Sequence, residues 1–230
     1  SWDYDSDEAS LVRFTVRHYE RARRIPIHLV ASITRATTLA HEAWVKARHE
    51  ADYSLFKPHL AEILDLKRRQ AEHLSPYQHI YDPLLDEHEP DMTAADVQAM
   101  FAGIKDNLIE LVQAIGERKG SVSDEVLRRN YDIERQRAFG LNVAQQIGYD
   151  LKRGRLDEAP HPFCTTFAID DVRITTRFDP NFMPTALFGT IHETGHAVYE
   201  QGIDPALNRT GLDEGASLGI HESQSRLWEN

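Results

Sequence analysis

The sequence contains a single cysteine, Cys164, so no disulfide can form within the chain. One cysteine in 230 residues fits a reducing compartment, and we predict a cytoplasmic protein. A lone cysteine is more often a small buried apolar side chain than a nucleophile, and we interpret Cys164 in that way. The same scarcity excludes a structural metal cage built from cysteines.

Long apolar runs and positive charge are scarce as well. No apolar stretch approaches the roughly 20 residues that cross a bilayer. The chain has 26 basic against 37 acidic residues and a net charge of −11, which repels phosphate backbones and anionic lipids. We therefore expect neither nucleic acid nor a membrane as a partner. The 41% apolar and 27% charged residues are typical of a globular protein.

Apolar residues recur at three- and four-residue steps through most of residues 1–160, which predicts helices. These helices are expected to begin near Asp7, Pro26, Pro58 and Thr93, and a further one to run from about Ser123 to a C-cap at Gly154. Thr93 and Asp96 form a capping box before an apolar stripe. The stripe comprises Val97, Phe101, Ile104, Leu108, Leu111 and Ile115. The inward residues of the helix after Pro26 are expected to be Leu29, Ile33, Ala36, Ala40, Trp44 and Ala47.

From Thr165 to Phe178 the period changes to two and β-branched residues become frequent, which predicts a strand or a hairpin that turns at Asp170-Asp171. One face of it carries Val172, Ile174, Thr176 and Phe178. The helical period returns after Pro184 and stops at Gly202, and a last helix is expected from about Ala216.

The segment Thr190 to Glu200 contains the pattern H-E-x-x-H, formed by His192, Glu193 and His196. On a helix, residues i and i+4 share one face, so both imidazoles can bind one metal ion. Glu193 is rotated by about 100° around the helix axis, where it can take a proton from a metal-bound water. The alternative is a pair of core histidines. Burying such polar groups in an apolar helix without a partner is costly, and we therefore predict a metal site.

A catalytic zinc site needs a third protein ligand and one open position. The metzincin pattern would place a histidine at position 202, where Gly202 stands. Among the acids nearby, Glu200 lies two turns from His192 on the same helix, and Glu214 lies in a loop or helix start. Glu222 lies on the last predicted helix, after a loop that lets the chain double back. We favour Glu222 as the third ligand.

Four motifs occur in order along the chain: HPF at 161–163, D-x-R-x-T at 171–175, HETGH at 192–196 and HESQSRLWEN at 221–230. Together they resemble the carboxypeptidase Taq family of bacterial and archaeal metallocarboxypeptidases. The loop YDPLLDEHEP and the early helices are similar to that family too, so the resemblance covers the whole chain. Asp91, directly after these residues in the longer loop YDPLLDEHEPDMT, stands where family members tend to have glycine.

The resemblance implies that His192, His196 and Glu222 bind one divalent metal, zinc or cobalt, and that Glu193 is the general base and acid. It implies stepwise removal of C-terminal residues from peptides, and a homodimer for the full-length enzyme. Family members are much longer and carry the motifs I-R-x-x-A-D and G-x-x-Q-D-x-H-W, which do not occur here. The chain therefore looks like a middle segment of such an enzyme, inactive or weakly active by itself.

The predicted fold class is mainly α: a helical, zincin-like metallopeptidase body with a small β-sheet beside the H-E-x-x-H helix. Residues 1–160 are expected to form a helical groove wall, and residues 161–230 the strand, the H-E-x-x-H helix and the third-ligand helix. We expect one continuous, truncated domain. Residues 171–178 are further expected to align the substrate by adding a peptide strand at the sheet edge.

Five further residues are candidates for substrate binding: His161, Asp171, Arg173, Thr175 and His221. For four of them a structural role is the alternative to substrate binding. His161 can hydrogen-bond to backbone, Asp171 and Arg173 can form a surface ion pair, and His221 can support the metal ligands from outside or lie on the helix surface.

Two other functions stay open at this point. One is an endopeptidase with the same metal chemistry, of the oligoendopeptidase type, and a peptide blocked at both ends distinguishes it. The other is a helical domain with a non-catalytic metal, for which a closed four-ligand shell would be expected. A glutamate at the position of a base favours the peptidase.

Overall fold

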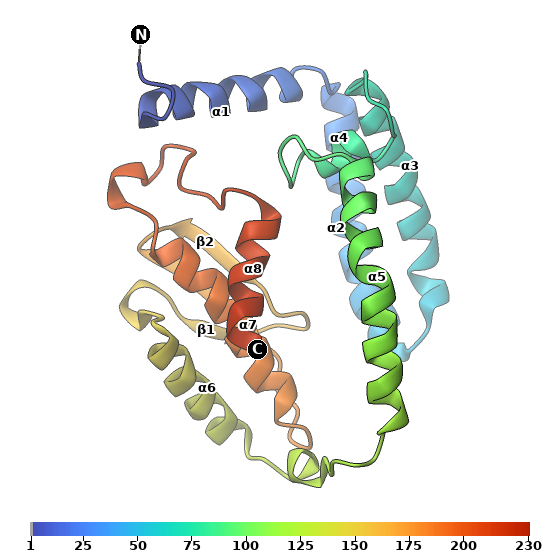
Figure 1. The fold of residues 1–230 in the computed structure, drawn as a ribbon, viewed down its shortest axis with the longest axis vertical. Helices are drawn as coiled ribbons and strands as arrows, with labels where there is room; N and C mark the ends of the chain where they lie inside the picture. The colour runs from blue at the N-terminus through green and yellow to red at the C-terminus, as the bar shows by residue number, and fades with distance from the viewer. Residues whose placement is uncertain (1) are drawn as a thin grey trace. The chain divides into compact units, whose positions relative to one another are not determined.

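The computed structural model describes residues 2–230 and divides the chain into two compact units, residues 1–103 and 104–230 (Figure 1). The first unit contains helices α1 (Asp7–Ala22), α2 (Ile27–Glu50), α3 (Lys57–His73), α4 (Asp82–Leu85) and the start of α5 (Ala94–Glu117). The second contains the rest of α5, then α6 (Ile133–Ile147), β1 (Leu156–Glu158), β2 (Cys164–Ala168), β3 (Asp171–Thr176), α7 (Pro184–Gln201) and α8 (Leu218–Glu229). Short 3₁₀ turns lie at Tyr53–Leu55, Glu125–Arg128, Leu151–Arg153 and Pro205–Leu207. The mainly helical fold with a small sheet is confirmed.

The core of the first unit lies between α2 and α3, which run side by side (Figure 1). Leu29 and Ala36 of α2 pack there against Leu66 of α3, and all three are buried. Leu29, Ala36, Ala40 and Ala47 are the buried residues of α2, and they belong to the inward set predicted from the helical period. Pro26 is the N-cap rather than the first helical residue, so α2 begins one position later than predicted.

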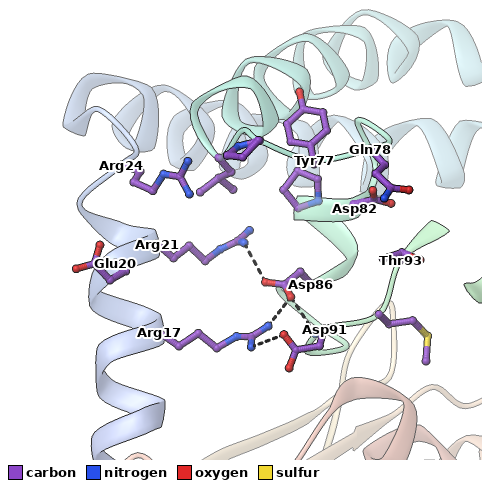
Figure 2. Close-up of a pocket in the computed structure, with 14 residues that line it drawn as sticks. Arg17, Glu20, Arg21, Arg24, Tyr77, Gln78, Asp82, Asp86, Asp91 and Thr93 are labelled. Carbon is purple, nitrogen blue, oxygen red and sulfur yellow. Dashed lines mark hydrogen bonds and ion pairs between the residues drawn. The ribbon is translucent and has the colours of Figure 1, made fainter. Parts of the chain in front are cut away.

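Helix α1 is held to the loop around α4 by charge rather than by apolar burial, since no residue between Asp7 and Ala22 is buried. Arg17 forms ion pairs with Asp86 and Asp91, and Arg21 pairs with Glu87 at 2.9 Å. Of these side chains, Arg17, Arg21, Asp86 and Asp91 line a pocket of about 490 Å³ (Figure 2). Asp91 has a φ of +65°, in the left-handed region that favours glycine.

Helix α5 begins with the predicted capping box. The Thr93 hydroxyl accepts a hydrogen bond from the Asp96 backbone N–H at 3.2 Å, and the Asp96 carboxylate accepts one from the Thr93 N–H at 3.0 Å. The apolar stripe behaves differently from an inward face, because no residue between Ala94 and Glu117 is buried. The helix is therefore confirmed, while its stripe is not part of a core among residues 2–230.

The helix predicted over residues 123–154 is shorter at both ends. Helix α6 begins at Ile133, where Asp132 caps it by accepting a hydrogen bond from the Arg135 N–H at 3.0 Å. It ends at Ile147, and the C-cap residue Gly148 has a φ of +121°, which glycine adopts without strain. The prediction missed both signals because the apolar residues continue on either side of the helix.

Gly154 was predicted as the C-cap of that helix, and this is wrong. Its backbone is extended, after a short 3₁₀ turn. A Cβ atom at this position would collide with the Val172 carbonyl oxygen and the Tyr149 hydroxyl. The glycine is therefore required by close packing and not by a helix end.

The sheet has the strand order β1-β3-β2, with β1 parallel and β2 antiparallel to β3. The predicted strand is thus a hairpin, and its turn lies at Ile169-Asp170, one residue before the predicted position. Val172, Ile174 and Thr176 are fully buried, as their alternation predicts. Because β3 is central and paired on both edges, the expectation that residues 171–178 add a peptide strand is wrong for the strand residues.

The core of the second unit lies between this sheet and the two helices that pack on it. Val172 and Ile174 of β3 contact Ala144 of α6 and Ala197 of α7 in one buried cluster. Helix α7 thereby sits on the sheet with nine of its residues buried. None of the helices within residues 2–230 combines the length and the hydropathy that a bilayer crossing requires.

Candidate metal centre

The H-E-x-x-H residues lie in the middle of α7, on a helix whose ends are fixed as the sequence predicts. Pro184 opens α7 and Gly202 is its C-cap. Glu193 and His196 are buried, and His192 is partly buried. The interior position removes these polar side chains from bulk water, so each requires a polar partner or an ion.

Helix α8 is brought against this stretch by an unusually close helix contact. Ser217 caps α8 by accepting a hydrogen bond from the Ile220 N–H at 3.2 Å. Gly195 then allows the two backbones to approach: a Cβ atom at Gly195 would lie 2.5 Å from the Ser225 Cα. Ser225 is fully buried in this contact. The close approach places Glu222, one turn before Ser225, beside the histidine pair.

The three predicted ligands meet at one point. The His192 and His196 Nε2 atoms are 3.3 Å apart, and Glu222 Oε2 lies 3.7 Å from the first and 3.3 Å from the second. A tetrahedral ion about 2.0–2.1 Å from each ligand atom would separate the ligands by about 3.3–3.4 Å. Two of the three separations match these values and the third, between His192 Nε2 and Glu222 Oε2, is slightly longer, so the three side chains form a possible metal site.

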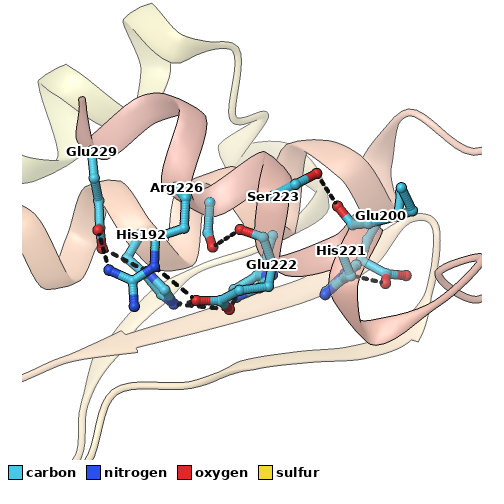
Figure 3. A network of polar contacts seen from close by, with 10 residues as sticks. His192, Glu200, His221, Glu222, Ser223, Arg226 and Glu229 are labelled. Carbon is cyan, nitrogen blue, oxygen red and sulfur yellow. Dashed lines mark hydrogen bonds and ion pairs between the residues drawn. The ribbon is translucent and has the colours of Figure 1, made fainter. Parts of the chain in front are cut away.

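A second layer of contacts surrounds His192 and Glu222 (Figure 3). The other ring nitrogen of His192, Nδ1, lies 2.6 Å from Glu229 Oε1. Arg226 donates to Glu222 Oε1 at 3.0 Å and to Glu229 Oε2 at 2.6 Å. Burial opposes ionisation of Glu229, but the hydrogen bonds from His192 and Arg226 outweigh it and lower the pKa of Glu229.

His196 is supported from another side. The His221 ring stacks on it, with centroids 4.4 Å apart and planes inclined by 20°. His221 Nε2 in turn lies 2.7 Å from Glu200 Oε1, and Glu200 is buried. Glu200, weighed above as a metal ligand, therefore partners His221 instead of joining the ligand group.

The electrostatics of the centre follow from burial. Burial, together with the charges of Glu222 and Glu229, raises the pKa of Glu193 to about 7 against the opposing effect of His192. Burial and the neighbouring imidazoles of His221 and His192 lower the pKa of His196, which favours the neutral ring that can bind a metal. Both shifts describe the centre without an ion.

Cys164, at the start of β2, lies near this group. Burial, with the charges of Glu193 and Glu200, raises the pKa of its thiol to about 12. The thiol is therefore protonated at neutral pH and a poor nucleophile, in agreement with its interpretation as a small apolar side chain.

The remaining candidates for substrate binding divide into separate places. Asp171 and Arg173 pair with each other through two hydrogen bonds of 2.7 and 2.8 Å, which is the surface ion pair named as their alternative. The Thr175 hydroxyl accepts a hydrogen bond from the Phe163 N–H at 2.9 Å and so joins β3 to the segment before β2. His161 is exposed in that segment. A role in substrate binding stays a prediction for each of them.

Sequence reasoning missed Glu229 and Arg226. Arg226 follows Glu222 by four residues, and Glu229 follows Arg226 by three. This spacing places all three along one side of α8. That helical spacing was the available signal. It became meaningful only once the crossing of α7 and α8 put this side of α8 against His192.

Comparison with known proteins identifies the family of the chain. The sequence model described as carboxypeptidase Taq (M32) metallopeptidase matches residues 1–230. The chain belongs to this family. It is 39% identical to carboxypeptidase 1 of Bacillus subtilis over 228 residues, and 41% identical to thermostable carboxypeptidase 1 of Thermus thermophilus over 234 residues. These alignments cover 99% and 98% of the chain.

Solved structures of carboxypeptidases share the fold. The M32 carboxypeptidase of Deinococcus radiodurans R1 superposes with a TM-score of 0.85 at 39% identity, over 98% of this chain and 46% of that one. A Pyrococcus furiosus carboxypeptidase, described as apo-Mg, gives 0.84 at 38% identity, over 98% of this chain and 46% of that one. The chain likewise spans about 46% of the length of the two curated relatives named above. Membership of a metallopeptidase family implies a divalent metal.

Proposed function

We propose that this chain carries the metal centre of a metal-dependent carboxypeptidase that removes C-terminal residues from peptides. The observation that carries the proposal is the meeting of His192, His196 and Glu222 at ligand spacing in a chain of the M32 family. Zinc is the proposed ion, with cobalt as the alternative, because two imidazoles and one carboxylate suit both. The relatives named above are all carboxypeptidases, which is the basis for proposing an exopeptidase.

A divalent ion in this position supplies a water of lowered pKa and polarises the scissile carbonyl. Glu193 is proposed to take the proton of the attacking water and to pass it to the leaving amine. Its place beside His192 on α7 gives a carboxylate next to the ligands that is not itself a ligand. Glu222, His192 and His196 are the residues that would hold the ion, and three protein ligands would leave it open to water or substrate.

Groups that recognise the substrate's terminal carboxylate are proposed to lie in the part of the full-length protein that the 230 residues do not include. The chain spans about 46% of its curated relatives, so the 230 residues alone are expected to bind metal and to hydrolyse peptides poorly. Loss of one oxyanion donor costs about 3–4 kcal/mol in other proteases, which is the scale of defect expected. We further propose a cytoplasmic, homodimeric full-length enzyme without nucleic-acid or membrane partners.

The test is Glu193→Gln in the full-length protein. The variant should retain the metal content of the wild type, because Glu193 is not a ligand, and should lose roughly 10²–10⁴-fold in kcat, because the base is gone. Metal analysis after dialysis and release of C-terminal amino acids measure the two effects. Glu62→Gln, an exposed carboxylate on α3, is the matched control. Normal hydrolysis by the Glu193 variant would remove the base assignment.

The type of peptidase is decided with two peptides of one sequence, one with a free C-terminus and one blocked at both ends. A carboxypeptidase releases residues only from the first. Cleavage of the blocked peptide at similar rates would replace the proposal with an endopeptidase of the same metal chemistry. Metal binding without cleavage of either peptide by the full-length protein would indicate a non-catalytic metal.

A further inference from the structure

An imidazole that binds a metal through one ring nitrogen has a second ring nitrogen, whose N–H usually donates a hydrogen bond. For His192 that nitrogen is Nδ1, and it lies 2.6 Å from Glu229 Oε1, near the end of α8. Both side chains are only 20% exposed, so the contact is largely screened from water. His196 differs, because its Nδ1 is buried and has no carboxylate partner among residues 2–230. Among the described residues, therefore, only the His192 ring has a carboxylate at its Nδ1.

We propose that Glu229 is a positioning residue for the metal centre: it fixes the tautomer and orientation of His192. This inference rests on the metal site proposed above. A carboxylate at Nδ1 accepts the ring proton there, which leaves the lone pair on Nε2. Nε2 is the atom that lies 3.3 Å from His196 Nε2 and 3.7 Å from Glu222 Oε2. Glu229 thus selects the tautomer that the site needs before any ion arrives.

Arg226 makes this effect cooperative with the third ligand. Its guanidinium donates to Glu222 at 3.0 Å and to Glu229 at 2.6 Å (Figure 3). One planar group therefore binds both the ligand carboxylate and the positioning carboxylate and fixes their separation. A guanidinium is well suited to this because its donors lie in a fixed fork. The same contact offsets the repulsion between two carboxylates that converge on one histidine.

A purely structural role for Glu229, as a link between α7 and α8, makes a different prediction. Loss of a helix link lowers the stability of the metal-free protein and leaves the electronic environment of a bound ion unchanged. Loss of a positioning residue lowers metal affinity by about 10- to 100-fold and changes the ligand field, even where the metal-free protein is equally stable. The two can therefore be separated by spectroscopy and by metal titration.

The experiment uses the full-length protein with Glu229→Gln, Glu229→Ala and the control Glu62→Gln. Cobalt(II) is titrated in competition with a chelator, the visible spectrum of the cobalt protein is recorded, and the unfolding temperature of the metal-free protein is measured. We expect at least 10-fold weaker cobalt binding by the Ala variant, a smaller loss for the isosteric Gln variant, and altered cobalt bands in both.

Cobalt affinities of both variants within twofold of the wild type, with unchanged bands, would overturn the inference. If the metal-free Ala variant is unstable, the cobalt affinity and spectrum of the Gln variant provide the test, because glutamine preserves the shape of the side chain. The wild type serves as the test of the underlying proposal: failure of the wild type to bind cobalt removes the metal site itself, whereas normal wild-type binding with unaffected variants removes only the role of Glu229.

Discussion

At the scale of single residues, the side chains of the centre each make two kinds of contact. Glu222 directs Oε2 to the histidine pair and Oε1 to Arg226, and His192 directs Nε2 to the centre and Nδ1 to Glu229. One atom of each side chain is thus available to an ion, while the other fixes its direction. Such an arrangement binds a metal with little loss of side-chain entropy, because the ligands are ordered beforehand.

Glu222→Gln tests the third ligand directly. An amide is a poor metal ligand and carries no charge, so the loss of affinity should exceed the roughly 10- to 100-fold effect typical of residues outside the ligand shell. Competitive titration of zinc against a chelator measures it. Glu214→Gln is the control, since Glu214 is exposed and was one of the two other acids weighed as the third ligand. The opposite result, with Glu214→Gln losing the metal, would reassign the ligand.

Asp82 provides a prediction about pH. Its carboxylate accepts hydrogen bonds from the backbone N–H groups of Ala94 and His79, each at 2.8 Å, and these lower its pKa below the ordinary 3.8. A lowered folded-state pKa stabilises the protein above the unfolded-state pKa, and this contribution is lost as the pH falls through the folded-state value.

Asp82→Asn should therefore lower the free energy of unfolding by a constant amount between pH 7 and about pH 5, and the difference from the wild type should shrink below about pH 4. Urea unfolding at a series of pH values measures both. Asp65→Asn, an exposed carboxylate on α3, should show no such dependence. A difference that grows on acidification would mean that the hydrogen bonds are not to the ionised form.

At the scale of elements, the crossing of α7 and α8 decides whether a site exists. Gly195 directly precedes His196 in the H-E-x-x-H pattern. The backbone of α8 at Gln224 and Ser225 occupies the space that a side chain at this position would need. A glycine in mid-helix costs about 0.5–1 kcal/mol relative to alanine, so its presence here exchanges helix stability for a close approach.

Gly195→Ala should consequently weaken metal binding and destabilise the fold. The new Cβ would lie 2.5 Å from Ser225 Cα, and backbone cannot yield as a flexible side chain does, so α8 must shift and carry Glu222 away. Overpacking of this kind typically costs about 1–3 kcal/mol. Gly103→Ala on α5 is the control, because nothing lies within 4 Å of its Cβ position. Thermal unfolding and zinc titration compare the two; equal behaviour would refute the packing argument.

The crossing of α7 and α8 separates the parts of the site that the sequence can predict from the parts that it cannot. The alignment of His192 and His196 on one face follows from the spacing within one helix. Glu222 could be favoured only as an acid on a later helix, because its approach to the histidines depends on how α7 and α8 pack. Glu229 depends on how two helices meet, which no spacing within one helix reveals. The boundaries of α6 were missed for a related reason: Asp132 and Gly148 are ordinary residues until the backbone gives one the role of a cap and the other a positive φ.

At the scale of the whole molecule, charge and apolar exposure act in opposite directions. The net charge of −11 keeps copies of the chain apart. Helix α5 favours association, since five side chains of its apolar stripe are more than half exposed: Phe101, Ile104, Leu108, Leu111 and Ile115. Contiguous apolar surface of this kind commonly leads to association in water.

We therefore expect the 230-residue chain to be monomeric at low ionic strength and to self-associate when salt is added. The screening length falls from about 30 Å at 0.01 M salt to about 3 Å at 1 M, which removes the repulsion and leaves the apolar attraction. Light scattering coupled to gel filtration measures the mass at each salt concentration. The double substitution Leu108→Gln and Leu111→Gln keeps the charge and should abolish the effect, whereas Val122→Gln, exposed outside α5, should not. Salt-independent mass, or association that survives the double substitution, would show that α5 does not drive the contact.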